Sequence, residues 1–165
     1  MHTDVYETFA TKFVAAAGAL KIGPANSMTC DVGPLISEAA ADRMQELVDD
    51  ALANGARLAL GGSRDAELGP SFYPPTVLLD VPSSAAVMKC EVFGTVVPIV
   101  RVEGVEEAVV AMNDSDFGWV QHCFLFHSLF SHASSSRCDE NTILQAHSWG
   151  VLVEQGGRGK CLIAC

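Results

Sequence analysis

Apolar residues recur every three or four positions near the start of the chain. This period predicts an amphipathic helix. The helix is expected to end in the segment 21–24, because Pro24 cannot extend it and Gly23 can adopt a left-handed cap. The apolar positions that define this stripe are Val5, Phe9, Phe13, Ala16 and Leu20.

A second helical period follows a polar loop. Ser37 is a favourable N-cap, and Glu38 places negative charge in the first turn, where the helix dipole favours it. Asn54 and Gly55 are typical helix-ending residues. The predicted buried stripe consists of Met44, Leu47, Val48, Ala51 and Leu52.

Short apolar runs predict three strands. Residues 57–60 precede Gly61–Gly62, and residues 76–79 follow two prolines. Residues 96–102 are apolar at nearly every position, as in parallel strands buried on both faces. Residues 105–112 return to a helical pattern. Because strands and helices alternate, the fold class is predicted to be α/β.

The composition predicts a soluble, single-domain protein. The chain has 165 residues, of which 49% are hydrophobic and 18% charged, so one folded core is expected. No apolar run is long enough to cross a bilayer, and residues 1–11 do not resemble a secretory signal, which favours a cytoplasmic location. The net charge of −10 argues against a nucleic-acid partner, since phosphate contacts require clustered Lys and Arg.

The composition changes abruptly after Gly118. Residues 1–118 hold 17 acidic and 7 basic residues, whereas residues 119–165 hold 3 of each. The second part also contains four of the five histidines, four of the six cysteines and both tryptophans. The two parts are therefore interpreted separately.

One short segment carries candidate chemistry. Glu91 lies two positions before Phe93, and Gly94 follows at the start of the run 95–102. A carboxylate beside an aromatic ring can hold a pair of sugar hydroxyls next to a flat ring. Taken alone, Glu91 would be a solvated loop carboxylate and Phe93 an ordinary core residue.

Segment 91–94 is one of six segments that, in order along the chain, resemble motifs of the NAD(P)-dependent aldehyde dehydrogenases. The resemblance covers Met1 to Gly118, and it is similar in style to the lactaldehyde-like and glyceraldehyde-like members. In order, the segments are Asp4–Tyr6 with Phe9, 31–36, 54–62, Phe72 with 75–77, 91–94 and 113–118.

The resemblance implies a partial catalytic domain with a mostly parallel sheet flanked by helices. In this family a cysteine thiolate attacks a small aldehyde, hydride passes to NAD or NADP, and a glutamate-activated water releases the acid. Glu91 matches the glutamate that accepts hydrogen bonds from the nicotinamide-ribose hydroxyls. Phe93 matches the aromatic side chain packed beside that ribose and ring.

The chain also departs from the family pattern. Thr95 replaces the usual proline, and Ala40 replaces a side chain that is often polar. The family nucleophile matches a segment before Met1, so no catalytic residue is expected here, and Cys30 and Cys90 are interpreted as ordinary thiols. We therefore expect an inactive fragment that does not bind NAD or NADP tightly by itself.

Residues 119–165 do not resemble the family, and two interpretations remain. A frame shift or mis-splicing would explain an irregular, unrelated tail. A metal site is the other interpretation, although the His spacing of five does not fit a helical pair. Its candidate ligands are His122, Cys123, His127, His132, Cys138, His147, Cys161 and Cys165.

Three functions follow from this sequence. The first is a partial aldehyde dehydrogenase domain. The second is a non-catalytic module that docks onto an intact family member or onto a second copy, because strand 96–102 would have an open edge. The third is a metal-binding tail protein.

Overall fold

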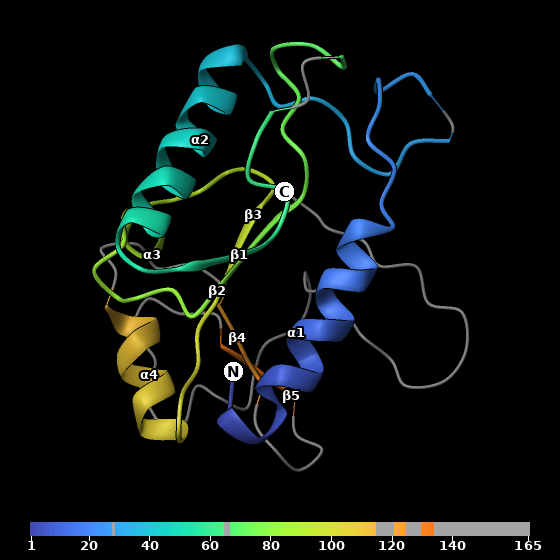
Figure 1. The fold of residues 1–165 in the computed structure, drawn as a ribbon. Coiled ribbons are helices and arrows are strands. Elements are labelled where there is room, and N and C mark those ends of the chain that lie inside the picture. The colour runs from blue at the N-terminus through green and yellow to red at the C-terminus, as the bar shows by residue number, and fades with distance from the viewer. Residues whose placement is uncertain (28, 65–66, 115–120, 125–129, 134–165) are drawn as a thin grey trace.

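The computed structural model describes residues 1–27, 29–64, 67–114, 121–124 and 130–133 (Figure 1). Backbone structure alone is described for the last two segments. The elements in order are α1 (Thr3–Gly18), α2 (Glu38–Ala53), β1 (Arg57–Leu60), β2 (Thr76–Leu79), α3 (Ala86–Lys89), β3 (Val96–Ile99), α4 (Val105–Asn113), β4 (Gln121–Phe124) and β5 (Phe130–Ala133).

A three-stranded sheet in the order β1–β2–β3 forms the centre of the fold. Strand β2 pairs in parallel with β3, from Thr76 opposite Val96 to Leu79 opposite Ile99. Strand β1 pairs with β2 in the antiparallel direction, so the sheet is mixed. The predicted α/β class is confirmed. Strands β4 and β5 form a separate antiparallel pair within the region expected to be irregular.

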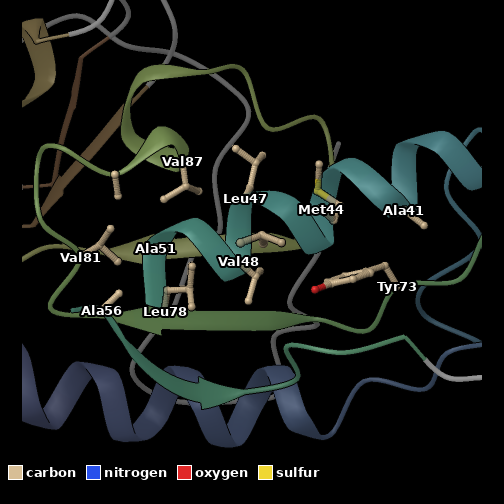
Figure 2. Packing of buried hydrophobic residues seen from close by; sticks show 12 residues of the cluster. Ala41, Met44, Leu47, Val48, Ala51, Ala56, Tyr73, Leu78, Val81 and Val87 are labelled. Carbon is tan, nitrogen blue, oxygen red and sulfur yellow. The ribbon is translucent and has the colours of Figure 1, made fainter. Parts of the chain in front are cut away.

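Helices α1 and α2 cover opposite faces of this sheet (Figures 1 and 2). Alternation along β2 directs Leu78 into the cluster under α2, and Val77 and Leu79 into the cluster under α1. All four residues of β2 are buried. Figure 2 shows Val48 and Ala51 of α2 lying over Leu78. The central strand therefore joins two apolar clusters, one on each face.

Helix α2 forms where its local signals place it. The Ser37 hydroxyl accepts a hydrogen bond from the Ala40 N–H at 3.1 Å, which confirms the predicted N-cap. The helix ends at Ala53, and Gly55 has a φ of 100°. The predicted buried stripe is confirmed except at Leu52, which is 36% exposed, while Ala41 is buried instead.

Helix α1 forms as predicted, but its buried face is shifted by one residue. Tyr6, Ala10 and Ala17 are buried, whereas Ala16 is exposed and Phe9 lies at the rim, stacked on Phe13. Small alanines let the helix approach the sheet closely, and this closeness could not be inferred from periodicity. The helix ends at Gly18, earlier than predicted.

Gly23 does not have the predicted left-handed conformation. A Cβ atom at this position would collide with the Cys30 sulfur. The segment pairs instead with residues further along the loop, through a bridge between Ile22 and Val32. Glycine is thus needed here because two loop segments approach closely.

Strand β3 ends at Ile99 and not at Val102, because a side chain separates the two parallel strands. The Tyr6 hydroxyl accepts a hydrogen bond from the Asp80 N–H at 2.8 Å and donates to the Ile99 carbonyl at 3.2 Å. These two backbone groups would be the next partners in a continued parallel ladder. Val102 pairs instead with His2. Part of the edge expected to be open is therefore covered by residues 1–3.

No helix among the described residues has the length and hydropathy needed to cross a membrane.

Candidate cofactor-contact site

Glu91 and Phe93 lie in the connection between α3 and β3. This connection passes the side of α2 before it enters the sheet at the buried residue Thr95. The Glu91 side chain is half-buried, and the Phe93 side chain is 61% exposed. An exposed Phe93 rules out the interpretation that it is an ordinary core residue.

Helix α2 contacts this connection at two consecutive residues. The exposed Arg43 guanidinium donates a hydrogen bond from Nη2 to the Glu91 carbonyl oxygen at 2.8 Å. The buried Met44 packs so closely that a Cβ atom at Gly94 would collide with its sulfur. Successive residues on a helix point about 100° apart, so one reaches the rim while the other enters the core. Glycine at position 94 is required by this close approach.

The other end of the connection is fixed by Thr95. Its hydroxyl donates to the Tyr73 carbonyl at 3.0 Å and also lies 3.2 Å from the Pro74 carbonyl. The Thr95 carbonyl accepts a hydrogen bond from the Thr76 N–H at 2.8 Å, one residue before the paired part of β3. The replacement of the family's proline by threonine therefore adds hydrogen bonds that anchor the loop.

Phe93 has an unfavourable backbone conformation between these two anchors. Its φ is 42°, a region that bulky residues rarely adopt. Such a conformation costs about 1–3 kcal/mol and persists only where the surroundings enforce it. Strained residues of this kind cluster at binding sites, which singles out Phe93 as a candidate contact.

The two side chains present the chemistry that a nucleoside would need. A carboxylate can accept two hydrogen bonds from neighbouring hydroxyls, and an exposed aromatic ring offers a flat apolar surface. The anchored loop holds both groups within three residues of each other. Glu91 and Phe93 therefore remain the candidate contacts for the ribose and ring of a nicotinamide nucleotide.

The described cysteines do not form a second site. Cys30 is half-buried and Cys90 is exposed, and both are free thiols. In the parts of the chain that the structure describes, no group of three His, Cys, Asp or Glu residues could hold a metal ion. The side chains of the eight candidate ligands in residues 119–165 lie outside the described residues, so the metal-site interpretation stays untested.

The sequence did not identify Arg43 or Thr95 as parts of the site. Arg43 looks in the sequence like any exposed residue of a helix. Thr95 was noted only because it replaces the proline that usually follows the motif at 91–94. Met44 was assigned to the core, where it lies. The charge of Arg43 by itself does not reveal that its guanidinium binds a backbone carbonyl 48 residues further along the chain.

Comparison with known proteins shows the family to which the chain is related. Residues 1–124 match the model of the aldehyde dehydrogenase family. A succinate-semialdehyde dehydrogenase (NADP(+)) of Mycobacterium avium is 43% identical over 119 residues, which are 72% of this chain and 25% of that protein. The chain therefore spans about a quarter of the length of this relative.

A solved structure shows the same arrangement of elements. The succinate-semialdehyde dehydrogenase from Burkholderia pseudomallei superimposes with a TM-score of 0.69 and 43% identity. The superposition covers 72% of this chain and 24% of that chain.

One alignment extends into the second part of the chain. A putative succinate-semialdehyde dehydrogenase (NADP(+)) 2 of Mycobacterium tuberculosis is 36% identical over 161 residues, covering 94% of this chain and 31% of that protein. The family model itself ends at residue 124. The division into 1–118 and 119–165 stays a prediction, as does the lactaldehyde-like or glyceraldehyde-like style.

Proposed function

The chain belongs to the aldehyde dehydrogenase family, and we propose that it supplies the nicotinamide-ribose contact of an NAD(P)-dependent enzyme that oxidises a small aldehyde. In this proposal Glu91 accepts hydrogen bonds from the ribose hydroxyls, and Phe93 packs beside the ribose and ring. The observation that carries the proposal is the strained, exposed Phe93 two positions after the half-buried Glu91.

The proposed substrate class is a small aldehyde, because the relatives above carry the name succinate-semialdehyde dehydrogenase. The nicotinamide cofactor supplies the hydride acceptor when bound. The chain's own residues bind and orient its ribose. Cys30 and Cys90 are not proposed as nucleophiles, since neither matches the position of the family's nucleophile. We also propose a cytoplasmic location and association with an intact family member or a second copy.

The 165-residue chain by itself is expected to show no dehydrogenase turnover. The purified chain would be incubated with succinic semialdehyde or lactaldehyde and with NAD or NADP. Formation of reduced nicotinamide should not exceed the rate without protein. The Mycobacterium avium relative serves as the positive control under the same conditions. A rate above the blank that scales with chain concentration would contradict inactivity.

Glu91→Gln is expected to weaken the binding of nicotinamide mononucleotide, a probe that contains the ribose and the ring. Hydrogen bonds to a charged group contribute about 1.5–3 kcal/mol, so the dissociation constant should rise about tenfold or more. Amide chemical-shift titration of the labelled chain measures this constant.

Glu46→Gln is the matched control, because Glu46 is an exposed glutamate of α2 and the change removes the same charge. Its dissociation constant should equal that of the wild type. Equal weakening in the two variants would attribute the effect to net charge and would refute the ribose contact.

A further inference from the structure

We propose that Arg43 is a positioning residue, which holds the Glu91–Gly94 connection in the conformation that presents Phe93 and aims the Glu91 carboxylate. This inference deepens the proposed ribose contact and rests on it for its purpose. The geometric part stands independently, because it concerns the conformation of the connection without any ligand.

The Arg43 Nη2 atom lies 2.8 Å from the Glu91 carbonyl oxygen, which is the length of a charge-assisted hydrogen bond. The bond joins a helix to the backbone of the connection, not to its side chain. It therefore restrains the direction of the Cα–Cβ bond of Glu91 through the backbone carbonyl and does not involve the carboxylate oxygens.

The backbone of Phe93 is strained. A bulky residue with a φ of 42° returns to the extended or helical region unless the backbone on both of its sides is restrained. On the C-terminal side, Gly94 packs against Met44 and the Thr95 hydroxyl binds the Tyr73 carbonyl. On the N-terminal side, Arg43 binds the Glu91 carbonyl, and Val92 packs against the core cluster under α2. Removing the guanidinium would take away the hydrogen bond of this pair of restraints and weaken the hold on the Phe93 backbone.

The Arg43 side chain lies outside the packed core. Arg43 is exposed, whereas the neighbouring α2 residues Met44, Leu47 and Val48 form the core cluster. Loss of the guanidinium therefore removes no buried apolar surface. Ser37 caps the helix independently of Arg43.

Arg64 provides a matched comparison. Its guanidinium also contacts α2, where it pairs with Asp42 and lies 3.9 Å from Glu38. Both of these carboxylate partners of Arg64 lie on the first turns of the helix and not on the connection 90–95. A substitution of Arg64 removes one positive charge that contacts the same helix and leaves the hydrogen bond to the Glu91 carbonyl in place.

The test uses isotope-labelled 165-residue chains carrying Arg43→Met, Arg43→Lys or Arg64→Ala. Methionine keeps an apolar stem and removes the donors, while lysine restores a single charged donor. The first readout is the φ of Phe93, from its three-bond coupling and carbon chemical shifts. The second is the dissociation constant for nicotinamide mononucleotide.

In R43M, Phe93 is expected to leave the positive-φ region, and the dissociation constant is expected to rise about tenfold. R43K should partly restore the positive φ of Phe93 and the affinity for the probe. R64A should match the wild type in both measurements. A wild-type φ at Phe93 in R43M would overturn the inference. So would loss of the unfolding transition in R43M, because it would make Arg43 a residue required for folding.

The design separates this inference from the proposed function. If the wild type does not bind the probe but Phe93 still relaxes in R43M, the positioning role stands and the ribose contact is refuted. If the wild type binds and R43M binds equally well with an unchanged φ, the ribose contact stands and the positioning role is refuted.

Discussion

Gly94→Ala is expected to lower the free energy of unfolding by about 1–3 kcal/mol, the usual cost of adding atoms to a packed core. The new Cβ atom would collide with the Met44 sulfur and would lie 3.1 Å from the Met44 Cγ atom. Met44 is 1% exposed, so its side chain has little room to move away. Chemical denaturation monitored by circular dichroism measures the loss.

The same collision predicts that a second substitution compensates for the first. Met44→Ala alone leaves a cavity and should cost about 2–5 kcal/mol. In the double variant, the alanine at position 94 projects into this cavity. The double variant should therefore lose less free energy of unfolding than the sum of the losses in the two single variants. The difference, which is the coupling energy, should be about 0.5–3 kcal/mol. Strict additivity would show that Gly94 and Met44 do not press on each other.

Gly18→Ala is the control for the change of glycine to alanine. Gly18 lies at the end of α1, and a Cβ atom there would be 3.5 Å from the Leu60 Cδ1 atom, an ordinary contact. Alanine favours helix over glycine by about 0.5–1 kcal/mol. This variant should be as stable as the wild type or more stable.

Tyr6→Phe is expected to lower the free energy of unfolding by about 1–3 kcal/mol. The lost hydroxyl joins the Asp80 N–H to the Ile99 carbonyl between the two parallel strands. The phenylalanine ring would still separate these groups, so neither would regain a partner in the ladder. The Arg101 guanidinium, which lies 4.0 Å from the centre of the Tyr6 ring, would keep that contact in the variant.

Tyr73→Phe is the matched control, because Tyr73 is equally buried but its hydroxyl makes one 3.3 Å hydrogen bond to a side chain, that of Gln45. It should cost about 0.5–1.5 kcal/mol, the net value of one ordinary hydrogen bond. A larger loss in Tyr73→Phe than in Tyr6→Phe would refute the bridging role of Tyr6.

Alkaline pH tests the same hydroxyl. Burial raises the pKa of Tyr6 from 10.0 to about 12, and burial also raises the pKa of Tyr73 to about 12. Each folded-state pKa is above its unfolded value, so the contribution of the protonated hydroxyl to the free energy of unfolding is fully present below pH 10. It is lost as the pH rises from about 10 to about 12. The chain has two tyrosines, and Tyr6→Phe keeps one of them. Its free energy of unfolding should therefore decline less steeply with pH than that of the wild type over this range.

Local signals predicted the elements that depend on a few neighbouring residues. The Ser37 cap, the ending at Asn54–Gly55 and the strand before Gly61–Gly62 all lie where the sequence placed them. Gly61 and Gly62 have φ values of 69° and 88°, which only glycine adopts readily. Each of these features depends on residues within a few positions of each other, so distant contacts have little influence on it.

Signals that depend on distant partners were less informative. The period of α1 was correct, but its buried face was wrong by one position, because the face is chosen by the sheet that Tyr6 and Ala10 contact. Strand β3 was predicted too long, because no local feature shows that Tyr6 ends its pairing with β2. Gly23 was predicted to form a left-handed helix cap, whereas in the structure it allows the close approach of Cys30.

The sequence by itself determined the family, the α/β class and the choice of Glu91 and Phe93, because ordered motifs and short-range periodicity are properties of the chain alone. The tertiary structure alone decided that Phe93 is exposed and strained, and that Arg43, Met44 and Thr95 hold it so. The physical reason is that a single backbone conformation at Phe93 is enforced by contacts from α2 and from the segment before β2. These segments meet the connection only when the chain has folded.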